Sequence, residues 1–290
     1  MSTVEATTAG EVEEDVEFVD MAFTKELRKA TKDVHKLTDV LVNAKFAIAL
    51  SDDEVWYDGL LAFYELYKFF ETHLPERLLP KELHRAAAFE RDFAYFYGPN
   101  WKDNYEPRPE VKKYLEHLEK VTAKNELLLF AYSYQMYMAL MSGGQMLQKK
   151  RMIARKLWIF PQGEDEEKQN HAEKEAELIT DKKANGEDED LESRPMPPQV
   201  TICPPGCEAT FFPEKISVLK ARLRRVFNNH YGAFDDELRE AFIEESRNVF
   251  RLNIEVVRTI KGVNRVYLKK LAIAAIFISS IVLAVRLAFK

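Results

Sequence analysis

Residues 125–160 read NELLLFAYSYQMYMALMSGGQMLQKKRMIARKLWIF, and this stretch decides the fold class. Apolar and aromatic residues recur in it at helical spacing, which predicts a long helix. Gly143 and Gly144 interrupt the pattern, and each glycine inside a helix costs about 1 kcal/mol relative to alanine. The pair therefore indicates a kink, which suits close approach of the backbone to a flat ligand, a helix–helix crossing or a simple helix break.

The helical period extends outward from this stretch in both directions. Almost no segment alternates with period two, and only ten glycines and twelve prolines are available for tight turns, which argues against a β-sandwich or barrel. In the first helix, Leu27, Val34 and Leu37 belong to the apolar stripe. We therefore predict an all-α fold, with helices expected at 23–41, 54–74, 82–97, 109–121, 125–160, 213–230 and 235–261.

The net charge of −6 is distributed unevenly along the chain. Residues 1–20 hold seven acidic residues and no basic one, residues 164–194 hold thirteen acidic and five basic ones, and the remainder carries a net +9. Blocks of like charge are usually solvated and disordered. We therefore predict a disordered acidic tail at 1–20 and a mobile, acidic and proline-rich insertion at 161–210. The helical body then covers 21–160 and 211–262.

The C-terminus carries a long apolar run. Residues 271–289 are apolar or small apart from Arg286, and Lys269 and Lys270 precede them. At about 1.5 Å per residue the run spans about 28 Å, close to the thickness of an endoplasmic reticulum bilayer. A buried core helix is the alternative, because the unbroken part before Arg286 is short for a span. We predict a tail anchor at 266–290 in the endoplasmic reticulum membrane, with the body facing the cytosol.

Among the six histidines, only His35 has chemically suggestive neighbours. Arg28 and Lys32 precede it by two turns and one turn, and Asp39 follows it by one, so all four share one stripe of a helix. An imidazole that binds a metal usually donates its other N–H to an acceptor such as a carboxylate, and cations can meet a ligand's anionic groups. An exposed stripe with ordinary i,i+4 pairs is the alternative. With the glycine pair, the stripe suggests a flat, anionic, metal-bearing cofactor such as heme between two helices.

Several motifs resemble those of the heme oxygenase family, in the same order along the chain. The likeness is to the tail-anchored eukaryotic type, with an atypical, insect-like distal helix that lacks an aspartate. It covers about residues 21–160 and 211–260. The motifs that carry it are ATKDVH at 30–35, ELHRAAA at 82–88 with FYGPNW at 96–101, SGGQ at 142–145 and FRLNI at 250–254.

The resemblance implies a single-domain helical fold with heme between a proximal helix and a kinked distal helix. Heme would be both substrate and cofactor, opened to biliverdin, CO and ferrous iron with O2 and electrons from NADPH through a microsomal flavoprotein reductase. His35 would be the proximal iron ligand, and Gly143 and Gly144 would form the distal side. The other heme-contacting positions implied are Arg28, Lys32, Asp39, Tyr134, Ala139, Leu140, Lys220, Arg224, Phe250 and Asn253.

The distal helix departs from the family pattern. The family has a glycine where Ala139 stands and an aspartate where Leu140 stands. That aspartate anchors a water network that delivers protons during oxygen activation, whereas Leu140 can neither donate nor accept a hydrogen bond. Met136 replaces an arginine, Tyr67 matches a tyrosine that would contact the aspartate, and Asp39 is one methylene shorter than the usual glutamate.

These departures predict slow turnover and a relaxed choice of the carbon at which heme is opened. The alternative is a heme-binding or heme-sensing protein on the same fold with little turnover. A third reading is a membrane-tethered helical scaffold without a cofactor.

A basic run follows the glycine pair. It is either a solvated helix face or a docking surface for the acidic reductase, with charge steering the encounter. Biliverdin reductase is a second candidate partner, and no nucleic-acid partner is expected. The run consists of Lys149, Lys150, Arg151, Arg155 and Lys156.

Two cysteines cannot form a disulfide framework, and the N-terminus has no apolar signal-peptide core, so a reducing, cytosol-facing setting is expected. Cys203–Pro204 resembles a heme regulatory dipeptide. Cys203 and Cys207 are also spaced for a local disulfide or half a zinc site, and plain reduced thiols in a linker are the alternative. His84 and His117 lack metal-ligand spacing, and we interpret His84 as structural by analogy with the family.

Overall fold

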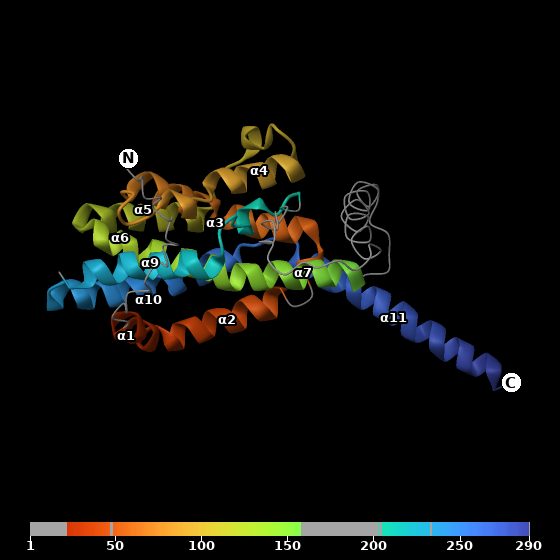
Figure 1. Cartoon of the computed structure of the whole chain (residues 1–290). Coiled ribbons are helices and arrows are strands. Elements are labelled where there is room, and N and C mark those ends of the chain that lie inside the picture. The colour runs from red at the N-terminus through yellow and green to blue at the C-terminus, as the bar shows by residue number, and fades with distance from the viewer. Residues whose placement is uncertain (1–21, 47–48, 158–202, 204, 233, 290) are drawn as a thin grey trace, which may run out of the picture.

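The structure is a computed structural model that describes the 290-residue chain except residues 1–21, 47–48, 158–202, 204, 233 and 290. All regular elements in the described part are helical, which confirms the all-α prediction (Figure 1). The α-helices are α1 (Ala22–Ala30), α2 (Lys32–Phe46), α3 (Asp53–His73), α4 (Ala86–Tyr97), α5 (Pro109–Lys124), α6 (Glu126–Ala139), α7 (Gln145–Leu157), α9 (Ile216–Tyr231), α10 (Asp236–Arg258) and α11 (Val263–Ala288). The shorter elements are the 3-10 turns η1 (Ala49–Ser51), η2 (Lys81–Leu83), η3 (Trp101–Asn104) and η5 (Glu208–Thr210) and the π-helical turn η4 (Leu140–Gly144).

Capping residues explain where several helices begin and end. Asp52, Asn125 and Asp235 cap α3, α6 and α10, each accepting a hydrogen bond from a backbone N–H of the first turn. Gly98, at φ +91°, ends α4 in a conformation that favours glycine. The helices expected from periodicity are present within a few residues, but the first is divided at Thr31 into α1 and α2.

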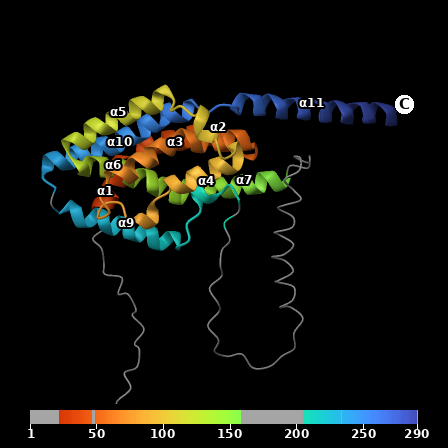
Figure 2. The ribbon, with the colours of Figure 1, turned by 90° about the horizontal axis from the view of Figure 1, so that it is seen from above.

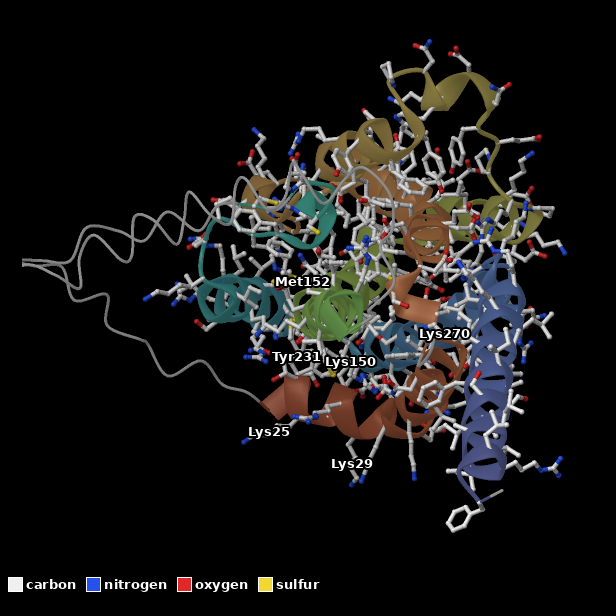
Figure 3. The ribbon with its side chains drawn as sticks, turned by 90° about the vertical axis from the view of Figure 1, so that its right-hand side faces the viewer. Lys25, Lys29, Lys150, Met152, Tyr231 and Lys270 are labelled. Atoms are coloured by element: carbon white, nitrogen blue, oxygen red, sulfur yellow. The ribbon has the colours of Figure 1, made fainter. Side chains whose placement is uncertain are left out.

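The helix α10 is the centre of the body, because it packs against α1, α2, α3, α5 and α6. Aromatic rings join α9 to the same core: Phe227 stacks on Phe23 of α1 at 4.9 Å and on Tyr134 of α6 at 4.4 Å between centroids. Figures 1 and 3 show α1 and α2 as a layer beneath α7 and α9. The two helices that were predicted to enclose a ligand therefore belong to different layers, joined through α9 and α10.

The apolar stripe of the first helix is only partly buried. Leu27 is 2% exposed, whereas Leu37 is 59% exposed, so only part of the periodic stripe enters the core. The reason is that α2 packs mainly along one side, against α10, and the edge of a broad stripe stays outside.

The end of the predicted insertion belongs to the core. Cys207, Ala209 and Thr210 are buried, so the prediction that the whole of 161–210 is a mobile appendage is wrong at its C-terminal end. Residues 158–202, which include the whole acidic block at 164–194, lie outside the described residues, as does the acidic tail at 1–20. The periodicity argument missed η5 because three residues are too few to show a period.

A buried carboxylate holds η5 in place. Asp92 of α4 is fully buried, and its two oxygens accept hydrogen bonds from the backbone N–H groups of Glu208 (2.8 Å) and Ala209 (2.9 Å). These bonds satisfy donors at the start of a buried turn, where an unmade hydrogen bond costs about 1–3 kcal/mol. Asp92 therefore attaches the returning chain to α4.

The helix α11 begins inside the body and ends outside it (Figure 2). Val263 and Val266 are buried, whereas Leu271, Ile276 and Leu283 are exposed. The helix is long and apolar enough to cross a membrane. An exposed apolar surface of this size is typical of a helix that crosses a membrane or packs against a partner.

Asp92→Asn should flatten the pH dependence of stability between about pH 4 and 6. Burial raises the pKa of the Asp92 carboxyl from 3.8 to about 6, although the two backbone donors oppose the shift. Because the folded-state pKa lies above the unfolded one, the folded protein holds an extra proton in this window. The free energy of unfolding therefore falls as pH rises through it, by up to about 3 kcal/mol.

Chemical denaturation of both proteins at steps from pH 4 to 7 measures this difference. Asp103→Asn, at an exposed position of η3, is the matched control. Parallel pH profiles for the wild type and the Asp92 variant would contradict the assignment.

Candidate functional site

The first part of the site is His35, on the first turns of α2 with its side chain 57% exposed. Its Nδ1 lies 2.9 Å from Oδ2 of Asp39, one turn further on. Because a carboxylate only accepts hydrogen bonds, Nδ1 is the donor, and Nε2 is the ring nitrogen left to bind a metal ion. The ring packs against Phe250 of α10, with 5.3 Å between centroids. An imidazole held in this way can bind a metal ion through Nε2.

Cations gather on the helices beside it. Arg28 on α1 and Lys32 on α2 are exposed. On α9, burial lowers the pKa of Lys220, and the positive charge of Arg224 one turn away adds to this effect. Burial raises the pKa of the Tyr134 hydroxyl, and the positive charge of Arg224 opposes this rise. Two crowded cations of this kind favour an anion bound between them.

The second part of the site is the junction of α6 and α7. The glycine pair does not end the helix but widens it into the π-helical turn from Leu140 to Gly144, a feature frequent at functional sites. A Cβ added to Gly143 would meet no atom within 4 Å, so open space borders the backbone there. A Cβ on Gly144 would lie 3.1 Å from Cδ1 of Leu140.

The side chains around the turn are mostly apolar. Ala139 is exposed, whereas Leu140 and Met136 are buried. The hydroxyl of Tyr67 donates to the backbone oxygen of Met136 at 3.0 Å. Asn253 of α10 donates through Nδ2 to the Met136 sulfur at 3.3 Å, and its buried Oδ1 has no hydrogen-bond partner among the described residues.

The π-helical turn is also held by hydrogen bonds to η5 that were not predicted from the sequence. Thr210 of η5 accepts a hydrogen bond from Gln145 through its backbone oxygen and donates one from its hydroxyl to Gln148, at 2.6 Å. Gln145 follows the glycine pair directly and was the only available signal. Its partner lies beyond residues 158–202, so no spacing rule could connect the two.

The basic run after the turn is not a single surface. Arg151 is 2% exposed, forms an ion pair with Asp53 and lies over the rings of two aromatic residues of α3. The prediction that Arg151 belongs to a docking surface is therefore wrong, because a buried, paired guanidinium cannot contact a partner protein. Lys149 and Lys150 are exposed, and Figure 3 shows Lys150 above the layer of α1. Of the five residues of the basic run, Arg155 and Lys156 have side chains that lie outside the described part of the chain.

The described residues give no support for a metal site at the two cysteines. Cys203 and Cys207 form no disulfide, and the described residues contain no group of three metal-ligating side chains. Burial raises the pKa of the Cys203 thiol to about 12, with the nearby Cys207 adding to the effect. Pro204 lies outside the described residues. His84 and His117 form hydrogen bonds inside the fold, which fits structural roles.

The sequence matches the family model described as heme oxygenase over residues 21–259. The chain belongs to the heme oxygenase family. It is 32% identical over 148 residues to heme oxygenase 1 of Homo sapiens, covering 47% of this chain and 49% of that protein. It is 36% identical over 150 residues to heme oxygenase 1 of Gallus gallus, covering 47% and 48%. The matched part of the chain thus spans about half the length of these relatives.

Solved structures share the fold. Heme oxygenase 2 from Chlamydomonas reinhardtii without heme has a TM-score of 0.59 at 21% identity, covering 82% of this chain and 96% of that one. Heme oxygenase-1 from Synechocystis sp. PCC6803 in complex with heme has a TM-score of 0.58 at 19% identity, covering 89% and 98%. At these identities the likeness concerns the fold.

The residues of this chain fit heme on several counts. Nε2 of His35 has a lone pair for iron, and the backbone at Gly143 borders open space where a flat ring can approach. Lys220 and Arg224 offer adjacent positive charge for carboxylates. The buried Oδ1 of Asn253 lacks a partner among the described residues, which suits a site completed by a ligand or water.

Asp39→Ala should weaken heme binding by about 10- to 100-fold, because the substitution removes the acceptor that orients the His35 ring and fixes its tautomer. Titration of heme into the protein, followed by the Soret band, gives the Kd. Asp39→Asn is the matched control, since its amide oxygen can still accept from Nδ1. An Ala variant that binds heme as tightly as the wild type would show that Asp39 does not orient the ligand.

Proposed function

We propose that this chain binds heme between α1–α2 and α6–α7 and degrades it to biliverdin, CO and ferrous iron, using O2 and electrons from an NADPH-dependent flavoprotein reductase. The observation that supports this most is the hydrogen bond from His35 to Asp39, which leaves Nε2 available as the proximal iron ligand. Heme, when bound, supplies the oxygen-activating iron and is itself the molecule that is opened.

The protein's own residues bind and orient the substrate. Arg28 and Lys32 on one side, with Lys220 and Arg224 on the other, would pair with the two propionates and fix how heme is rotated in the site. Phe250 packs against the His35 ring and restricts its tilt. These contacts decide which edge of the ring lies nearest the distal helix.

The distal side would hold few proton donors. Met136, Ala139 and Leu140 carry no N–H or O–H on their side chains, and the Tyr67 hydroxyl already donates to a backbone oxygen. Protons would then come from bulk water or from water held by Asn253. The methyl of Ala139 occupies space where the family has glycine. Both features support slow turnover and a mixture of biliverdin isomers.

The same apolar distal side supports a second candidate, a heme-binding or heme-sensing protein with little turnover. Adding reductase and NADPH to the heme complex separates the two, because only the oxygenase converts heme to biliverdin. A scaffold without a cofactor would show no Soret change when heme is added.

We also propose that α11 anchors the chain in the endoplasmic reticulum membrane with the body in the cytosol. Its length and apolar surface support the anchor. The membrane identity and orientation rest on the lysines that precede the apolar run. The reductase is the proposed partner there, and biliverdin reductase is a second.

Leu140→Asp should accelerate single-turnover heme degradation at least about tenfold and narrow the products to one biliverdin isomer, because it restores a distal proton relay. Leu140→Asn, similar in size but without the carboxylate, is the matched control. Chromatography of the products after one turnover measures both effects. Rapid formation of only the α isomer by the wild type would refute the relaxed selectivity, and an Asp variant unchanged in rate and product would refute the proton-delivery argument.

Reversing the exposed charge on α7 should slow electron transfer from the reductase. We expect Lys149→Glu with Lys150→Glu to reduce the rate at low salt by about tenfold, an effect that screening removes as salt rises. The matched control is Lys120→Glu with Lys124→Glu, which reverses two exposed charges on α5. A wild-type rate that does not respond to salt would argue against docking through this face.

A further inference from the structure

The connection between the body and the apolar helix leaves little freedom. The helix α10 ends at Arg258 and α11 begins at Val263. Within this short link, the backbone N–H of Lys261 donates to Asp58 at 2.7 Å. Gly262 has φ +81°, and a Cβ there would lie 3.1 Å from Val55 of the core. The apolar helix therefore leaves the core directly rather than through a flexible tether.

The first turns of α11 are clamped to the start of α3. Arg265 forms ion pairs with Asp52 (3.3 Å) and Glu54 (2.5 Å). Tyr267 donates to a backbone oxygen at the end of α2 at 2.7 Å, and Lys270 donates to a hydroxyl of η1 at 2.9 Å. These bonds come from successive turns of one helix, so they fix its direction as well as its position.

The same acidic turn also holds α7. Arg151 pairs with Asp53, which stands between the two acids that bind Arg265, and α7 and α11 both pack against η1. Directly after Arg151, Met152 and Ile153 are exposed, and Ile153 is 59% exposed.

The level of a bilayer follows from the exposure along α11. From Leu271 onward, directly after Lys269 and Lys270, the helix is apolar and exposed at nearly every position. The lipid surface therefore falls near these two lysines. The helix α7, which carries the exposed Ile153, packs against the same short element, η1, to which Lys270 is hydrogen-bonded.

We propose that α11 and the body form one rigid unit, and that this unit presses the C-terminal end of α7, through Ile153, against the phospholipid surface. The proposal rests on the membrane anchor proposed above. The occupant is the bilayer because the exposed apolar part of α11 sets the lipid surface near Lys269 and Lys270, and because Ile153 would otherwise remain in water. Lys149 and Lys150, about one turn further from the lipid, stay in water beside the headgroups and remain open to a partner.

Photo-crosslinking of the full chain in vesicles of phosphatidylcholine and phosphatidylserine tests the contact. A benzophenone amino acid replaces one residue at a time: Ile153, Ile278 in the outer part of α11, or Glu237. Glu237 is the distant control, because α10 is 23 residues long and its first turn lies about 35 Å from its last. We expect lipid adducts from positions 278 and 153 and none from position 237.

A second variant tests the rigidity. A flexible Gly/Ser linker inserted between Lys261 and Gly262 should abolish the adduct at position 153 while the adduct at 278 persists. Arg265→Ala removes the ion pairs between α11 and α3 without lengthening the chain, and it should reduce the yield of the lipid adduct at position 153. Heme binding by each variant shows that the body is folded.

The outcomes separate the two proposals. No adduct at position 278 would show that α11 does not insert, which refutes the anchor itself. Adducts at 278 without any at 153 would refute the lipid contact of α7. An adduct at 153 that survives the linker would refute the rigid unit.

Discussion

The position of α10 determines whether the two halves of the site face each other. On one side Phe250 packs against the ring of His35, and on the other Asn253 contacts the sulfur of Met136. These two α10 residues are three positions apart, so they lie on adjacent parts of one helix face. Any rotation of α10 would move the proximal and distal contacts together. Few independent adjustments of the site are therefore possible.

Charged groups hold α10 in that position. Arg247 binds both carboxylate oxygens of Asp33, which lies two residues before His35 on α2, at 2.7 and 2.8 Å. This hydrogen bonding is the main reason that the pKa of Asp33 falls to about 2. Two residues before Arg247, Glu245 accepts hydrogen bonds from His117 and Tyr132, which joins α10 to α5 and α6. Proximal and distal helices are thus each bonded to α10 by polar contacts and packed on it by apolar ones.

Sequence periodicity predicted the helices because each one buries a face, and the bond from His35 to Asp39 follows from the one-turn spacing of a helix. Periodicity could not predict that Arg151 is buried, because a run of consecutive basic residues does not indicate which of them face the core. The contacts of Thr210 with α7 were also out of reach, since they join segments far apart in the chain. Contacts within one helix could be predicted from the sequence. The direction in which a side chain points, and contacts between distant segments, could not.

The burial of Arg151 follows from the first turn of α3. Asp52, Asp53 and Glu54 stand at a helix N-terminus, where negative charge is stabilised by the backbone dipoles. Three adjacent carboxylates repel one another, and the pairing of Arg151 and Arg265 relieves that repulsion from two directions. The turn that starts α3 thereby fixes α7, which continues the distal helix, and α11, which leaves the body. A change in these acids would therefore disturb the distal side and the apolar helix together.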